Sequence, residues 1–137
     1  MERPIRFLLS RDEGVAPSGD WIVASSLRDA GFEVILGGPQ TPENAAEAAL
    51  EEGPDLVGYG ISAGSAVEPI TRLLARMREL GIGELSVVVG ASLGGADVVA
   101  LRELGVDEVF DPFSRLDEAI RRFRGLGFEA RSRAHPA

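Results

Sequence analysis

The chain contains at residues 5–20 the stretch IRFLLSRDEGVAPSGD, which decides the fold. Its first part, Ile5-Arg6-Phe7-Leu8-Leu9, is a short apolar run typical of a buried strand. A loop of small and acidic residues follows. The next stretch predicts a helix over residues 19–30, with Ser18 as its N-cap and Gly31 at its end. A strand, a loop and a helix in this order form the first unit of an alternating α/β fold.

The same alternation continues to the end of the chain. Further strands are predicted at residues 32–36, 56–61, 85–89 and 108–110, and further helices at residues 41–53, 67–80, 97–104 and 114–125, with Thr41 and Ser114 as N-caps and Gly125 as the last stop. Five strands alternating with five helices require a parallel sheet covered on both faces. Right-handed crossovers then favour a doubly wound, flavodoxin-like (Rossmann-like) sheet of order 2-1-3-4-5. We expect one domain over residues 1–128 and a flexible tail over residues 129–137.

Composition excludes several kinds of chemistry. The chain of 137 residues has no cysteine and a single histidine, His135, close to its end. Disulfides, thiolate metal sites and a Ser-His-Asp triad within the domain are therefore not expected. The net charge of −8 disfavours nucleic-acid binding. No apolar run is long enough for a membrane span, so the sequence predicts a cytoplasmic protein that contacts neither nucleic acid nor membrane.

The position of a binding site follows from the predicted topology. In a doubly wound sheet, ligands bind beyond the carboxyl ends of the strands, at the switch point of the strand order. The loops at residues 10–20, 62–66, 90–96 and 111–114 meet there. They and the strand ends beside them are rich in small residues, including Gly60, Ser62, Gly64, Gly90, Ala91 and Ser92. Small side chains let a flat group approach the backbone, so we expect a crevice at this edge.

Three runs extend the pattern into a family resemblance: residues 27–35 (LRDAGFEVI), 40–43 (QTPE) and 101–110 (LRELGVDEVF). Together with the first loop, they resemble the cobalamin-binding domain of methylmalonyl-CoA mutase over about residues 5–126. The resemblance implies a domain that presents adenosylcobalamin to a larger catalytic subunit of an isomerase. No barrel-like segment for such a subunit is present in these 137 residues.

The resemblance also implies the cofactor-binding residues and one loss among them. The family loop reads Asp-x-His-x-x-Gly, and its His binds cobalt; the matching positions here are Gly14, Ala16 and Gly19. An alanine cannot coordinate a metal, so the motif is degenerate and no metal ligand is expected. Phe113 stands where the family has a glycine, and we expect it to crowd the crevice. The remaining cofactor-binding candidates are the small residues at the ends of the third and fourth strands that are named above.

Three functions stay open on these observations. Cobalamin could bind with its own base on cobalt, in a small subunit or accessory protein. The crevice could instead serve a cobalamin-independent enzyme that uses Asp12, Glu13 and Asp111 as general acid and base toward a small-molecule ligand. The domain could also be a non-catalytic interaction module, and a homo-oligomer is open in each case. Trp21 is expected in the core or, if exposed, at a partner surface.

Overall fold

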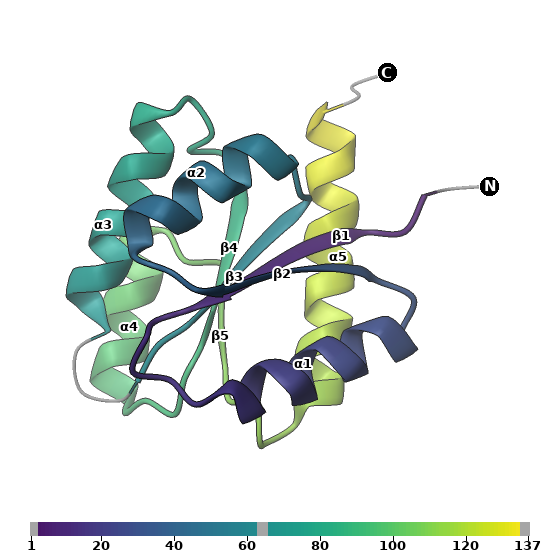
Figure 1. Ribbon diagram of the computed structural model, residues 1–137, viewed down its shortest axis with the longest axis horizontal. Helices are drawn as coiled ribbons and strands as arrows, with labels where there is room; N and C mark the ends of the chain where they lie inside the picture. The colour runs from purple at the N-terminus through teal and green to yellow at the C-terminus, as the bar shows by residue number, and fades with distance from the viewer. Residues whose placement is uncertain (1–2, 63–65, 135–137) are drawn as a thin grey trace.

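The computed structural model describes residues 3–62 and 66–134. Its sheet has five parallel strands in the order β2-β1-β3-β4-β5, which confirms the predicted topology. The elements in chain order are β1 (Arg6–Arg11), α1 (Pro17–Asp29), β2 (Glu33–Pro39), α2 (Pro42–Glu52), β3 (Leu56–Gly60), α3 (Val67–Glu79), β4 (Ser86–Gly90), α4 (Gly95–Leu104), β5 (Glu108–Phe110) and α5 (Leu116–Ala134). Helices α1 and α5 lie on one face of the sheet, and α2, α3 and α4 lie on the other (Figure 1).

Each face of the sheet has its own apolar core. The α1–α5 side packs three rings together, with the centroid of Phe123 lying 5.5 Å from that of Phe7 and 5.0 Å from that of Phe110. Gly58 makes room for this packing, because a Cβ at that position would lie 2.5 Å from Cε1 of Phe7. The other side is formed largely by aliphatic side chains and the buried ring of Tyr59. The central strands β3 and β4 are buried on both faces, as in other parallel sheets covered by helices.

The expected ends of α2 are confirmed. The Thr41 hydroxyl accepts a hydrogen bond of 3.1 Å from the backbone N–H of Asn44, and Pro42 occupies the first helical position. Gly53 ends the helix in the left-handed conformation, with φ of 58°. The local sequence was sufficient here because the cap, the proline and the glycine act within one or two turns of the helix.

The predicted cap of α1 is wrong. The helix begins at Pro17 with Ala16 as N-cap, and no side chain caps it. Proline is favoured at the first helical position because its missing N–H would have no partner there. The start of α1 therefore lies two residues earlier than predicted, and Ser18 lies inside the helix.

The predicted stop of α5 at Gly125 is also wrong. The helix begins at Leu116, two residues after Ser114, and continues to Ala134. Gly127 lies inside this helix at a point of close packing. A Cβ there would lie only 2.6 Å from Cγ2 of Ile5, so the position favours glycine. Residues 129–134, expected to form a tail, are thus helical, and the Arg131 guanidinium donates hydrogen bonds to the carbonyls of Arg3 and Pro4. Residues 135–137 lie outside the described residues.

Among the described residues, no helix combines the length and the apolar character that crossing a membrane requires.

Candidate functional site

A cleft opens beyond the carboxyl ends of β3, β4 and β5, beside the first turn of α1. Its volume is about 160 Å³, and it is lined by Val15, Ala16, Ser18, Gly19, Ile61, Gly90, Ala91, Ser92, Asp111, Pro112 and Phe113. The cleft lies at the predicted edge of the sheet and joins three of the four predicted loops. Its lining consists of small and apolar side chains with two hydroxyls and a single carboxylate.

Small residues shape the walls of the cleft in two ways. Gly90 ends β4 against the ring of Phe110, where a Cβ would come within 3.0 Å of Cζ. Gly19 lies in the first turn of α1, and a Cβ built there would meet no atom within 4 Å. The first glycine is therefore required by core packing, whereas the second leaves open space beside the cleft.

The loop between β1 and α1 is closed by an ion pair at its two ends. Arg11, the last residue of β1, pairs with Asp20 in the first turn of α1, with Nη1 and Oδ2 2.5 Å apart and both side chains largely buried. The Arg11 Nε is buried without a hydrogen-bond partner among the described residues. Between these ends, the backbone N–H of Asp12 donates to the carbonyl of Gly60 over 2.8 Å. Ala16 itself is exposed.

The structure brings together most of the predicted cofactor-binding residues. Six of them line the cleft: Ala16, Gly19, Gly90, Ala91, Ser92 and Phe113. Gly14 and Ser62 are neighbours outside this lining, since a Cβ on Gly14 would lie 3.7 Å from the Ser62 Oγ. Gly60 faces Arg11 instead, with a Cβ there 3.4 Å from the Arg11 Cβ. Gly64 lies outside the described residues.

Phe113 does not fill the cleft. Its side chain lines the rim and is 68% exposed. The backbone N–H of Phe113 donates to Oδ1 of Asp111 over 2.9 Å, which closes an Asx turn and directs the chain outward. The prediction that this ring crowds the crevice is therefore wrong, because the turn at Asp111 places the ring on the rim.

The three predicted carboxylates are distributed unevenly around the cleft. Asp111 lines it but accepts the turn hydrogen bond from Phe113. Asp12 and Glu13 lie outside the lining, and Glu13 is exposed. The cleft thus contains one carboxylate that already has a structural partner, whereas general acid–base catalysis by a carboxylate pair needs two groups directed at the same substrate.

A polar cluster holds the neighbouring loop between β2 and α2. The Ser10 hydroxyl donates to Oε1 of Gln40 over 2.7 Å, and the Tyr59 hydroxyl donates to the Gln40 carbonyl over 2.8 Å. Burial of the Tyr59 ring, reinforced by the charge of Asp12, raises the pKa of its phenol to about 12. Tyr59 therefore stays neutral and keeps its proton for this hydrogen bond, and its ring is a fully buried part of the core.

Sequence reasoning missed Val15, Ser18, Ile61 and Pro112 as lining residues. Pro17 was the available signal for Ser18, because a helix starting at the proline places the following residue in its first turn. Sequence reasoning also missed a second groove of about 280 Å³ on the outer side of α1. It is bordered by Arg11, Pro17, Asp20, Trp21, Leu36, Gly37, Gly38 and Pro39.

Fold and cleft together define a doubly wound α/β domain with a ligand cleft at the carboxyl edge of its sheet. The model of the B12 binding domain matches residues 8–121, and the chain belongs to this family, as a cobalamin-binding domain of the mutase type. The 2-hydroxyisobutanoyl-CoA mutase small subunit of Aquincola tertiaricarbonis is 35% identical over 115 residues, which are 79% of this chain and 81% of that subunit.

Two further relatives show how the chain compares in length. The pivalyl-CoA mutase small subunit of Xanthobacter autotrophicus is 34% identical, with 95% of this chain and 88% of the subunit covered. The methylmalonyl-CoA mutase of Cereibacter sphaeroides is 29% identical over 95% of this chain, but only 18% of that protein is covered. The chain therefore spans most of the length of these two small subunits but less than a fifth of the length of this methylmalonyl-CoA mutase.

Solved structures support the fold. A cobalamin-binding protein from Desulfitobacterium hafniense has a TM-score of 0.72 at 17% identity, covering 90% of this chain and 60% of that one. The RcsC C-terminus of E. coli, which contains a phosphoreceiver domain, has a TM-score of 0.75 at 18% identity, covering all of this chain and 51% of that one. At such identities the likeness concerns the architecture alone.

The cleft fits part of the cofactor that the family implies. Its volume of about 160 Å³ is below the roughly 300–1,000 Å³ of small-molecule pockets, so a corrinoid would extend across the mouth beside Ala16 and Phe113. The open space at Gly19 and the hydroxyls of Ser18 and Ser92 suit a flat group with polar edges. The lining offers no imidazole or thiolate, and the described residues include no group of three His, Cys, Asp or Glu that could hold a metal ion.

Proposed function

We propose that this protein is the cobalamin-binding small subunit of a two-chain mutase and works with a larger catalytic subunit. The match to the B12 binding domain supports this proposal. The similarity to two mutase small subunits, most of whose length the chain covers, supports it as well. The single observation that carries it is the small-walled cleft at the carboxyl edge of the sheet, where Ala16, Gly19 and Ser92 converge. In such a mutase, cobalamin supplies the radical that starts the rearrangement.

Within this function, we propose that the chain holds cobalamin without a protein ligand to cobalt. Ala16 occupies the position of the family histidine, and the orienting carboxylate at Gly14 is missing as well. A metal-binding imidazole depends on such a partner for its tautomer and orientation. Gly19, Ser18 and Ser92 would then hold the cofactor by its edges, while cobalt keeps the cofactor's own base.

The experiment is to mix the purified protein with hydroxocobalamin and with adenosylcobalamin, desalt each mixture, and record visible spectra. We expect a coloured protein with a base-on spectrum. A colourless protein would remove cobalamin binding from the proposal and would favour another use of the crevice.

Two variants test the missing ligand. Ala16→His alone should leave the base-on spectrum unchanged, because no carboxylate orients the new imidazole. The double variant Gly14→Asp, Ala16→His should shift the spectrum toward histidine coordination, since a Cβ at Gly14 has only an ordinary 3.7 Å contact with the Ser62 Oγ. Histidine coordination in the single variant would show that the carboxylate is not needed.

A further inference from the structure

The charge of the molecule is concentrated at the edge that holds the cleft. The loops and helix starts of this edge contain Asp12, Glu13, Asp20, Glu43, Glu68, Asp97, Asp111, Asp117 and Glu118, against Arg11 and Arg115. Acids at helix N-termini are favoured by the helix dipole, and here all five helices carry one in the first turn. Five of these acids, Asp12, Glu13, Asp97, Asp111 and Glu118, form no ion pair within residues 3–62 and 66–134.

The opposite edge is close to neutral. Arginines in the last turns of the helices lie near acids of the strand starts, as in the pairs Arg102–Glu108 at 3.5 Å and Arg131–Asp55 at 3.2 Å. At the cleft edge, Arg11, Arg72 and Arg121 form ion pairs with some of the acids and offset only part of their charge, so this edge keeps a net negative charge. A field of this kind attracts a basic surface and repels an acidic one.

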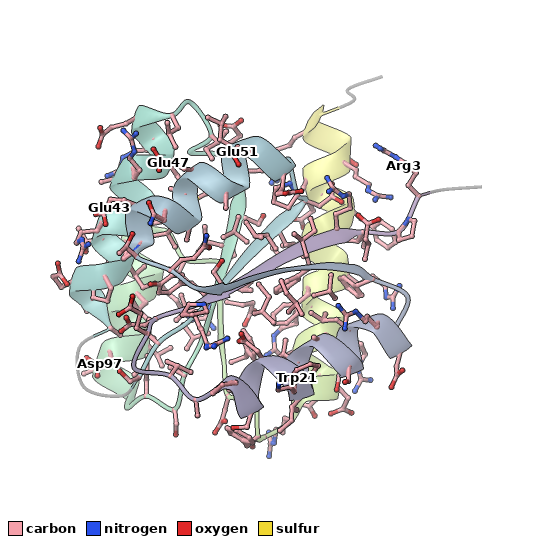
Figure 2. The ribbon with its side chains drawn as sticks, viewed as in Figure 1. Arg3, Trp21, Glu43, Glu47, Glu51 and Asp97 are labelled. Atoms are coloured by element: carbon pink, nitrogen blue, oxygen red, sulfur yellow. The ribbon has the colours of Figure 1, made fainter. Side chains whose placement is uncertain are left out.

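The two most exposed aromatic side chains lie at the same acidic edge. Trp21 in the first turns of α1 is 65% exposed beside the second groove, and Phe113 on the rim of the cleft is 68% exposed. Figure 2 shows Trp21 near the bottom of the molecule, Asp97 at its lower left and Glu43 at its left, whereas Glu51 lies near the top. Exposed Trp and Phe beside a concave site are the residue types that most often anchor protein interfaces.

We propose that this edge docks a partner protein with a basic face, and that its anchors are Phe113 on the rim of the cleft and Trp21 beside the second groove. The inference rests on the proposed function, since the partner is the catalytic subunit that receives the cofactor. The acidic rim steers the partner toward the cleft, and the two rings become buried when it arrives. The groove of about 280 Å³ between α1 and β2 gives room beside Trp21 for a side chain of the partner.

The test measures binding of the cobalamin-loaded chain to the purified mutase large subunit of the same organism, by titration at several salt concentrations. We expect a dissociation constant that rises steeply with salt. Trp21→Ala and Phe113→Ala should each weaken the complex at least tenfold. The matched controls Leu50→Ala and Phe128→Ala, which remove side chains 47% exposed near the other ends of their helices, should change it less than twofold.

A charge series tests the steering separately. Neutralising Asp12, Glu13 and Asp97 together (D12N, E13Q, D97N) should slow association about tenfold and flatten its salt dependence. The control variant E51Q, E84Q, E103Q removes the same charge near the opposite edge and should leave the association rate unchanged.

The outcomes separate the two proposals. If the Leu50 and Phe128 variants weaken the complex and the Trp21 and Phe113 variants do not, the proposed docking face is wrong. The proposed small-subunit function is not affected by that result. A cobalamin-loaded chain that forms no complex with the large subunit overturns both the partnership and the docking face, while cobalamin binding remains.

Discussion

Two loops at the same edge of the sheet differ in how they are held. The loop between β2 and α2 is fixed on both sides, because Ser10 and Tyr59 donate hydrogen bonds to Gln40 and the hydroxyl of Thr41 caps the helix. The loop between β1 and α1 has an exposed Ala16 as its N-cap and no capping side chain. The loop between β2 and α2 is part of the scaffold, whereas the loop between β1 and α1 lines the cleft. Substitutions in the two loops should therefore affect different properties.

The largest effect is expected for Gly37→Ala in the β2 segment of the fixed loop. Gly37 is the extra residue where the β1–β2 register shifts, and its Cβ would lie 2.3 Å from the Ser10 Oγ and 2.8 Å from Oε1 of Gln40. Overpacking of this kind should lower the free energy of unfolding by about 2–3 kcal/mol in urea titrations. Adding Ser10→Ala should restore part of the loss. Equal stability of the Gly37→Ala variant and the wild type would mean that this loop can move.

Tyr59→Phe should have the next largest effect. It removes the 2.8 Å hydrogen bond to the partly buried Gln40 carbonyl, which costs roughly 1 kcal/mol. Urea unfolding at neutral pH measures the loss, and the cobalamin spectrum should be unchanged because Tyr59 is not part of the cleft lining.

Alkaline pH should lower the free energy of unfolding through the same tyrosine. The pKa of Tyr59 is raised to about 12 in the folded protein, against about 10 in an unfolded chain. Its contribution is complete below pH 10 and is lost as the pH rises toward 12, because the unfolded chain gives up the proton first. The loss should be about 1 kcal/mol by pH 11, and it should be absent in Tyr59→Phe. Since the chain has one tyrosine, its phenolate absorbance reports the titration directly.

The smallest effect on stability is expected for Gly19→Ala, and it should have the opposite sign. Gly19 lies in the first turn of α1 and a Cβ there would meet no atom within 4 Å, so alanine should stabilise the helix by about 0.5 kcal/mol. The new methyl group stands at the cleft, so cobalamin binding should weaken severalfold in spectroscopic titrations. A variant that is less stable and binds cobalamin normally would contradict the distinction between the loops.

The resemblance and the alternating pattern predicted the fold and the family, because each element depends on residues within a few turns. Thr41 and Gly53 end α2 as expected, and the strand order is confirmed. The pattern failed at Gly125, because α5 continues past it and its last turns pack against the start of the chain, where Arg131 donates hydrogen bonds to the carbonyls of Arg3 and Pro4. It failed at Ser18 because the proline before it is the stronger start signal.

The candidate site was predicted as a set of loops but not as a geometry. Six of the ten predicted cofactor-binding residues converge on the cleft, since the carboxyl ends of parallel strands share one edge. Asp12 and Glu13 do not join Asp111 there, and Phe113 lies on the rim. These outcomes depend on turns and hydrogen bonds between loops that come from separate strands, and no local pattern encodes them.

The sequence by itself determined the order of elements, the edge of the sheet that carries the crevice, and the absence of an imidazole at position 16, because periodicity, caps and residue identity are local properties. Only the tertiary structure decided that Trp21 and Phe113 lie exposed at an acidic edge, that a side chain at Gly37 would displace Ser10 and Gln40, and that Gln40 joins three segments. Each of these depends on which distant residues become neighbours when the sheet and its two helical layers pack together.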